Sequence, residues 1–428
     1  KPEAEKAGAA CSLPVGVVKS VQKKSLSEAA PLLHDLTSLQ KECNKKLGLT
    51  AERTLEFSQA LYEGKFITYP RTGSRYIGDD IFEQVPGLIK SFAGGERYGK
   101  QAEQLSSREL GKRSVDSNKV TDHHAIIPTG LIPTTTGSEI EIYWMIVARF
   151  LEAFMPSCKK EVTTVSITMG ENFIAKWTVI LEEGWRAIQG VVGDSEEVGQ
   201  ELPELKENQE VSNKGLEVVR KVTKPKPLHT EATLLDAMLT CGKDLEDEDL
   251  REAMKDSGLG TPATRAAIIE TLFNRAYIER QKKSLVPTDK GLGVVRLVKE
   301  MDIAKPELTG NWEKMLLDIE RGKASPESFM SAITYYSRNL TSDILDMSVP
   351  VVNTACECPK CKSNGLLFVK NKKLDALACE NRSCGFILFR EVAGKSLSDS
   401  QLKLLASSRA TGKIKGFKSK AGKAFEAS

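Results

Sequence analysis

The chain contains 428 residues, and its 61 Lys and Arg residues against 58 Asp and Glu residues leave a formal net charge of +3. At about 100–200 residues per domain, this length predicts two to four domains, each able to bury a hydrophobic core. No run approaches the roughly 18 apolar residues of a membrane span, which excludes an integral membrane protein, and the start has no signal-peptide pattern, so we expect a cytoplasmic protein.

The charge is unevenly distributed. Residues 350–428 contain 15 Lys and Arg residues against 6 Asp and Glu residues, a local charge of +9, which leaves −6 for residues 1–349. A basic block on a mildly acidic body indicates an appendage that binds polyanions. Five of the nine cysteines lie in the same block. Without an export signal, clustered cysteines indicate a metal site rather than disulfides.

Helical patterns dominate the first 160 residues. Residues 26–63 place leucines at helical spacing, and Thr50 is a suitable N-cap for the second part of this stretch. A short β-like run follows at 66–69. The polar, Gly- and Ser-rich stretch 86–120 predicts an exposed loop, whereas the apolar spacing at 140–154 predicts another helix.

Alternating patterns then predict a β-hairpin. Segments 161–169 and 173–181 alternate apolar and polar residues, and the Gly-Glu-Asn tripeptide between them is typical of a tight turn. The acidic stretch 192–216 predicts a loop, and the prolines at 224–229 predict a stiff connector. Farther along, the sequence predicts a winged-helix-like unit. It consists of a helix starting at Thr261-Pro262, a hairpin at 277–288 and a helix capped by Thr288.

Tyr69 and Arg71 form the first candidate site. Pro70 between them favours an extended Tyr69 whose hydroxyl can project away from a core. A tyrosine with a pKa of about 10 is ionised to about one part in a thousand at pH 7, a cost of roughly 4 kcal/mol, so a nucleophilic tyrosine needs a base or cationic neighbours. Arg71 could hold a phosphate through two parallel hydrogen bonds. On residue types alone, a partly buried tyrosine beside a surface arginine is the simpler interpretation.

Two further segments are candidates for phosphate contact. His123 and His124 are adjacent, so their side chains diverge and at most one faces a shared site, where it would hold a phosphate oxygen or relay a proton. A solvent-exposed His pair is an equally good interpretation.

The run Ser257-Gly258-Leu259-Gly260-Thr261 leads into a helix N-terminus that favours anions. No Gly-Lys-Ser/Thr follows it, which excludes an ATP-binding loop, and taken alone a simple helix cap is the better interpretation.

Cys358, Cys361, Cys379 and Cys384 form a third candidate site. A Cys-x2-Cys pair precedes a second pair by 17 residues, which is typical of a zinc ribbon, although four residues inside the second pair is wider than usual. Free thiols in a degenerate ribbon are the alternative.

Taken together, the motifs resemble the type IA DNA topoisomerases, specifically the bacterial topoisomerase III branch. Five motifs occur in the order expected for that family: FITYPRT, DHHAIIPTG, GLGTPATRAAIIETL, the YI…LVPTDKG hairpin and PELTGNWEKML. The resemblance implies that Tyr69 is the nucleophile that takes the 5′ phosphate of a broken strand, that Arg71 positions the scissile phosphate and that His123 contacts it. It also implies DNA contacts by His124, Thr264, Arg265 and Arg75. Gly73 departs from the Asp that is common after the Thr.

The family fold is a mixed α and β multidomain toroid. The resemblance assigns a β-rich arch (domain II) to residues 1–30 and 156–225, helical domain III with the active-site tyrosine to 31–155, the C-terminal part of a helical, winged-helix-like domain IV to 226–345, a zinc-ribbon-like module to 350–390 and a basic C-terminal repeat to 391–428. We expect a monomer that binds single-stranded DNA near the nucleoid, with Zn²⁺ in the ribbon.

The resemblance also predicts what the chain lacks. The family's Toprim domain binds Mg²⁺ through paired carboxylates, yet only 68 residues precede Tyr69 and the first is Lys1, so we expect a fragment without that domain and with impaired cleavage. Two alternatives stay open: a non-catalytic single-stranded DNA-binding gate scaffold, or another DNA enzyme with a tyrosine nucleophile, such as a recombinase or relaxase. A recombinase would carry its tyrosine late in the chain, and a relaxase would carry a His triad.

Overall fold

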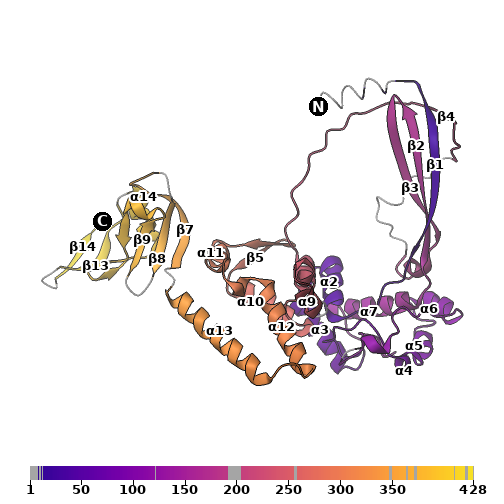
Figure 1. The fold of residues 1–428 in the computed structure, drawn as a ribbon, viewed down its shortest axis with the longest axis horizontal. Coiled ribbons are helices and arrows are strands. Elements are labelled where there is room, and N and C mark those ends of the chain that lie inside the picture. The colour runs from indigo at the N-terminus through magenta and orange to yellow at the C-terminus, as the bar shows by residue number, and fades with distance from the viewer. Residues whose placement is uncertain are drawn as a thin grey trace. The chain divides into compact units, whose positions relative to one another are not determined.

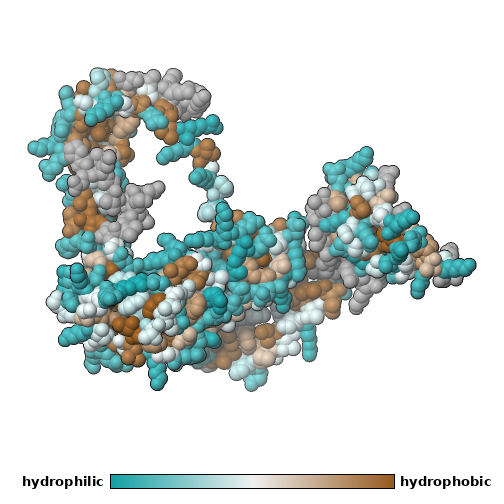
Figure 2. Space-filling model, turned by 180° about the vertical axis from the view of Figure 1, so that it is seen from behind, coloured by the Kyte–Doolittle hydropathy of each residue, from teal (hydrophilic) through white to brown (hydrophobic). Residues whose placement is uncertain are grey.

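The computed structural model describes residues 8, 11, 13–120, 122–190, 204–254, 258–346, 349–362, 365–370, 374–408, 410–419 and 423–427. These residues form two compact units, the first spanning residues 1–235 with 261–266 and the second spanning residues 236–260 with 267–428. On the face drawn in Figure 2, hydrophilic and hydrophobic side chains are interspersed in small patches. Within the described residues, no helix is both long and apolar enough to cross a membrane.

A four-stranded antiparallel sheet lies at one end of the first unit (Figure 1). Its strands are β1 (Val15–Glu28), β2 (Cys158–Met169), β3 (Glu171–Glu182) and β4 (Glu210–Ser212), in the order β3-β2-β1-β4. Gly170 turns the chain between β2 and β3 with a φ of 74°, a conformation that glycine adopts without strain. The predicted hairpin is therefore confirmed. The part of the predicted 192–216 loop that lies at 192–203 is outside the described residues.

Helices surround the main hydrophobic core of the first unit. They are α2 (Leu36–Leu47), α3 (Ala51–Glu63), α4 (Asp79–Phe82), α5 (Val85–Ser91), α6 (Gly99–Ser106) and α7 (Ser138–Phe154), with short 3₁₀ turns η1 (Ser117–Lys119) and η2 (Gly184–Ala187). Helix α7 is apolar along most of its length, and Ile142, Phe150 and Phe154 are fully buried. They pack with Leu39 of α2 and Leu61 of α3 in one core cluster. Burial of these side chains supplies the main driving force for this unit.

Two sequence predictions in this region are wrong. Residues 26–28 belong to β1, where they pair with residues 158–160, and the helix starts only at Leu36 because the Asp35 side chain accepts a hydrogen bond from the Ser38 amide at 2.7 Å and caps it. The predicted loop at 86–120 contains most of α5 and all of α6. Widely spaced apolar residues anchor these short helices; they are Val85, Ile89, Phe92, Ala102 and Leu105, all buried.

The second unit has helix–hairpin–helix order, as predicted. It contains η3 (Cys241–Asp244), α9 (Glu248–Ala253), β5 (Ile278–Gln281), β6 (Ser284–Pro287), α11 (Asp289–Val298), η4 (Asp302–Ala304), α12 (Pro306–Glu320) and α13 (Pro326–Asp346), while α8 (Glu231–Thr240) and α10 (Pro262–Asn274) run through both units. Thr288 caps α11 through a hydrogen bond from the Gly291 amide at 3.1 Å. A Cβ at Gly291 would lie 2.0 Å from the Tyr277 carbonyl oxygen, so this close approach of helix and hairpin requires glycine.

The C-terminal part of the second unit is one packed module. Its strands are β7 (Val349–Glu357), β8 (Gly365–Lys370), β9 (Asp375–Cys379), β10 (Ile387–Phe389), β11 (Glu391–Val392), β12 (Lys395–Ser396), β13 (Ile414–Lys418) and β14 (Ala424–Ala427), with η5 (Arg382–Cys384) and helix α14 (Asp399–Ser408). Phe368 and Leu377 of the four-stranded sheet share a hydrophobic core with Leu402 and Phe417. The ribbon-like and repeat segments therefore pack together, while the predicted domain boundaries stay predictions.

Candidate active site

The segment that carries Tyr69 is fixed against a second, antiparallel segment. Residues 66–72 run alongside residues 123–129, far away in sequence. The Thr68 amide donates to the Ile127 carbonyl at 3.0 Å, and the Thr68 hydroxyl accepts from the Ile127 amide at 3.0 Å. This pairing brings the predicted nucleophile and the predicted His pair to the same place.

Thr72 fixes the other end of this pairing. Its buried hydroxyl donates to the carbonyl oxygen of His123 at 2.9 Å and accepts from the Ser74 amide at 3.0 Å. The Thr72 carbonyl in turn accepts from the Leu36 amide at the start of α2, at 3.1 Å. One buried threonine thus joins the segment of Tyr69, the segment of His123 and helix α2.

Two aromatic rings contact Tyr69. The ring centroids of Tyr69 and His123 lie 4.5 Å apart at an interplanar angle of 51°. Tyr62, in the last turn of α3, lies edge-on to Tyr69 with centroids 5.3 Å apart at 75°. Tyr69 is half-buried and its hydroxyl forms no hydrogen bond with any residue that the structure describes. The hydroxyl is therefore open to an incoming group.

Arg71 and the two histidines differ in what they contact. Arg71 is exposed and forms no hydrogen bond or ion pair within the described part of the chain, so its guanidinium is open to an anion. His123 is also exposed. His124 is half-buried, and its Nδ1 lies 2.7 Å from the Ala125 carbonyl oxygen, which makes that nitrogen a donor. Of the pair, only His123 contacts Tyr69.

The start of α10 lies beside the same loop. A Cβ at Gly73 would lie 3.4 Å from Pro262 Cγ, in ordinary van der Waals contact. Thr264 lies in the first turn of α10 and is exposed, and its hydroxyl accepts a hydrogen bond from the Thr261 amide at 2.9 Å. Ser257, the first residue of the predicted glycine-rich run, lies outside the described residues. The predicted Thr264 site is therefore brought close to the Tyr69 segment.

Arg75 and Arg265 contact the protein interior. Arg265 is 1% exposed and donates to the Thr37 hydroxyl at 2.9 Å. Arg75 is half-buried and donates to the carbonyl oxygens of Leu33 at 3.0 Å and Leu32 at 3.3 Å. Both residues hold chain segments together in this structure, and the DNA contacts predicted for them stay predictions.

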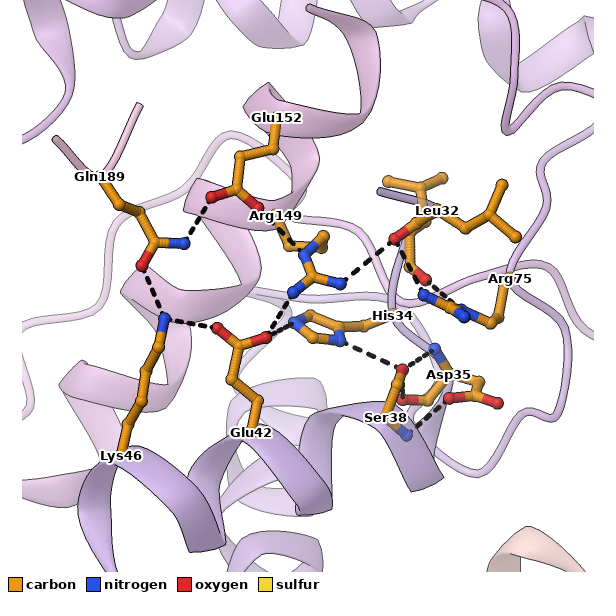
Figure 3. Close-up of polar contacts among 11 residues, drawn as sticks. Leu32, His34, Asp35, Ser38, Glu42, Lys46, Arg75, Arg149, Glu152 and Gln189 are labelled. Atoms are coloured by element: carbon orange, nitrogen blue, oxygen red, sulfur yellow. Dashed lines mark hydrogen bonds and ion pairs between the residues drawn. The ribbon is translucent and has the colours of Figure 1, made fainter. Parts of the chain in front are cut away.

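A partly buried polar network, which the sequence did not predict, lies next to the site (Figure 3). Glu42 of α2 accepts from Arg149 of α7 at 2.5 Å and from Lys46 at 2.7 Å, and it lies 3.4 Å from the Nε2 of buried His34. Arg149 also donates to Glu152 at 3.1 Å. The network continues through Gln189, which donates to Glu152 and accepts from Lys46. No local pattern could reveal the long-range pairs of this network, because Glu42 and Arg149 lie 107 residues apart and Lys46 and Gln189 lie 143 residues apart.

The same network perturbs two titratable groups. Burial, aided by the positive charges of Arg149, Arg75 and Lys46, holds the pKa of His34 well below its usual value. Burial raises the pKa of Glu152, although Arg149 and the Gln189 hydrogen bond oppose that shift. His34 is thus neutral at neutral pH, and its carbonyl oxygen accepts from the Ile126 amide at 2.8 Å. The network therefore connects directly to the segment of His123.

The four predicted cysteines come together. Their Sγ atoms all lie within 4.8 Å of one another, with Cys358–Cys384 and Cys361–Cys379 each at 3.7 Å. Four sulfurs at 2.3 Å from a tetrahedral Zn²⁺ would lie about 3.8 Å apart, so the cluster fits this ion. Among the described residues it is the only group of three or more His, Cys, Asp or Glu side chains placed to hold a metal.

Two family models match this chain. Residues 1–331 match the family model described as DNA topoisomerase, and residues 383–428 match the model described as the C-terminal repeat of topoisomerase. DNA topoisomerase 3 of Bacillus cereus (strain ZK / E33L) is 37% identical over 386 residues, which cover 86% of this chain and 52% of the relative. DNA topoisomerase 3 of Bacillus subtilis (strain 168) is 34% identical over 388 residues, which cover 86% and 53%.

A solved structure extends the likeness to the fold. The structure of full-length topoisomerase I from Thermotoga maritima superposes with a TM-score of 0.68 at 25% sequence identity and covers 92% of this chain and 63% of that one. The chain spans about half the length of the curated relatives that it matches.

Proposed function

Because this chain belongs to the type IA DNA topoisomerases and is topoisomerase 3-like, we propose that it acts in ATP-independent cleavage, strand passage and religation of single-stranded DNA. The observation that carries this proposal is the contact between Tyr69 and His123, 4.5 Å between ring centroids, together with the exposed Arg71, which has no ion-pair partner among the described residues. These three side chains offer a nucleophile, a phosphate contact and a fixed positive charge.

In the proposed cleavage step, the Tyr69 hydroxyl oxygen attacks the scissile phosphorus. An O–P bond to tyrosine forms, the bond from phosphorus to the 3′ oxygen breaks, and the proton of the phenol ends on the departing 3′ oxygen. Arg71 would hold two non-bridging oxygens with its planar fork, and His123 would contact a third position on the phosphate. The phosphotyrosine keeps the energy of the broken bond, so religation runs the same step backwards without ATP.

Groups outside the reacting centre would bind the DNA strand. The exposed Thr264 at the start of α10 supports a contact to the strand that enters the site. The C-terminal residues 350–428, with their local charge of +9, support a second contact that holds the strand electrostatically. His124, Arg75 and Arg265 would contribute by fixing the protein around the strand.

Zn²⁺ and Mg²⁺ have different places in this proposal. The four cysteines would hold Zn²⁺, which would tie the strands of the ribbon together. We assign Mg²⁺ no ligand and no step in this chain. We propose instead that the 428 residues, purified by themselves, bind single-stranded DNA and cleave it slowly.

A binding and relaxation assay tests this proposal. The purified chain should bind a labelled single-stranded oligonucleotide more tightly than the same sequence as a duplex, and Arg71→Gln should weaken that binding. In a parallel assay with Mg²⁺, supercoiled plasmid should stay largely unrelaxed. Equal affinity for duplex would overturn the single-strand proposal, and rapid relaxation would overturn the proposal of slow cleavage.

A further inference from the structure

Tyr62 is a surface tyrosine that the proposed chemistry does not use. It lies in the last turn of α3 and is 39% exposed. Its ring packs edge-on against Tyr69, with centroids 5.3 Å apart at 75°, a favourable geometry for two aromatic rings. Its own hydroxyl forms no hydrogen bond with a described residue. Whatever Tyr62 does within the protein is therefore done by its ring.

The ring contact matters because no hydrogen bond within the described part of the chain orients the Tyr69 side chain. Hydrogen bonds of Thr68 and Thr72 fix the main chain on both sides of Tyr69. The Tyr69 hydroxyl itself has no partner among the described residues, so its direction depends on how the ring is held. In the part of the chain that the structure describes, the aromatic rings that contact it belong to Tyr62 and His123.

The Tyr62 side chain is not needed to end α3. The turn after the helix is formed by main-chain bonds, from Lys65 to the Tyr62 carbonyl at 2.8 Å and from Phe66 to the Leu61 carbonyl at 2.9 Å. A Cβ at Gly64 would lie 2.5 Å from the Phe66 ring, so that glycine and Phe66 set the shape of the turn. Changing the Tyr62 side chain leaves all these groups in place.

We infer that Tyr62 is a positioning residue for Tyr69: its ring restricts the Tyr69 ring so that the hydroxyl points toward the scissile phosphate. This inference rests on the proposed role of Tyr69 as nucleophile. Misplacement of a reacting atom by about 1 Å can lower a rate about 100-fold. Loss of the Tyr62 ring should therefore slow the attack while leaving DNA affinity in place.

Fluorine NMR tests the positioning directly. In chain labelled with 3-fluorotyrosine, the eight tyrosines give separate signals, and Tyr69→Phe identifies the signal of Tyr69. Tyr62→Leu should move that signal, whereas Tyr62→Phe should leave it near its original position because the ring is kept. Tyr335→Leu, which removes a 71% exposed tyrosine of α13 in the second unit, serves as the matched control. A Tyr69 signal that moves no more in Tyr62→Leu than in Tyr335→Leu would overturn the inference.

A reaction rate gives the second readout. An oligonucleotide with sulfur in place of the 3′ bridging oxygen releases a thiolate, which leaves more readily than an alkoxide, so covalent attachment to Tyr69 can be followed in this chain. Tyr62→Leu should slow attachment about 10- to 100-fold with unchanged DNA affinity, and Tyr62→Phe should restore it. Equal rates in Tyr62→Leu and wild type would overturn positioning. A moved fluorine signal together with no attachment in wild type would support positioning and overturn the role of Tyr69 as nucleophile.

Discussion

The Thr72 hydroxyl donates a hydrogen bond to the main-chain carbonyl oxygen of His123 at 2.9 Å. This bond joins two segments that are about 50 residues apart in sequence, and Thr72 is only 3% exposed. The position of His123 against the Tyr69 ring is thus determined partly by a side chain that is buried away from solvent.

Thr72→Val should loosen this site. The substitution keeps the shape of the side chain but leaves the His123 carbonyl and the Ser74 amide without their buried partner, which typically costs about 1–3 kcal/mol. We expect a lower melting temperature of the first unit and weaker protection of the 123–129 amides in hydrogen exchange. Thr136→Val, at an exposed threonine of the same unit, is the control. Unchanged exchange at 123–129 in Thr72→Val would contradict this account.

Arg71 and Arg265 should respond in opposite ways to neutral substitution. Arg71→Gln removes an exposed charge, so the melting temperature should be unchanged. The slope of log affinity against log salt for single-stranded DNA should fall in magnitude by about 0.7, which is the value for one lost phosphate contact. Arg265→Gln removes a buried group bonded to Thr37, so the melting temperature should fall and the salt slope should stay. A changed salt slope with unchanged melting in Arg265→Gln would show that Arg265 contacts DNA instead.

Removal of the metal should unfold the whole C-terminal module. Cys384 supplies one of the four sulfurs and lies inside the region matched as a topoisomerase repeat, and Phe368 of the ribbon shares a core with Leu402 and Phe417. Because metal binding to such a site is coupled to folding, a chelator or Cys384→Ser should make both α14 and β13 sensitive to protease.

Cys356→Ser is the matched control, since Cys356 lies outside the four-sulfur cluster. It should retain about one Zn²⁺ per chain and stay protease-resistant. Digestion confined to the ribbon, with α14 left intact, would show that the repeat folds independently of the metal.

Stability of the first unit should depend on pH through His34. Burial holds the pKa of His34 well below the unfolded value of about 6.5, so the unfolded state binds the proton first. The stabilisation is complete above about pH 6.5 and is lost as the pH falls toward the folded pKa, by up to about 1.4 kcal/mol per pH unit.

The difference between wild type and His34→Gln isolates this contribution. Glu152 acts in the opposite direction, because burial raises its pKa, but it is present in both proteins and largely cancels. Between pH 7 and pH 5.5, we expect the melting temperature of wild type to fall more than that of His34→Gln. Parallel curves for the two proteins would contradict the assignment of a neutral, buried His34.

Local patterns predicted the β-hairpin, helix α7, the winged-helix order and the four-cysteine cluster, because each depends on residues close together in sequence. The same patterns failed at 26–35, where leucines at helical spacing lie at the end of β1 and in the segment before α2. They also failed at 86–120, where short helices are anchored by few apolar residues. Tertiary pairing with residues 158–160 determines the first case.

The candidate site was predictable only in part. Tyr69, Arg71 and His123 stand in recognisable motifs, whereas Tyr62 has no local signal beyond lying seven residues before Tyr69. Arg75 and Arg265 show a different limit, since charge and position in a motif do not reveal burial. The partners of Arg265 and Glu42 come from distant helices, and these contacts exist only once the chain has folded.

The most direct test of the account is to locate the covalent bond between protein and DNA. The purified chain is incubated with a single-stranded oligonucleotide carrying a 3′ bridging sulfur, digested with trypsin and analysed by mass spectrometry. The account predicts that the 5′-phosphoryl DNA fragment is attached to the peptide that contains Tyr69, and that Tyr69→Phe abolishes it while Tyr76→Phe does not. Attachment to another residue, or an undiminished adduct in Tyr69→Phe, would contradict the account.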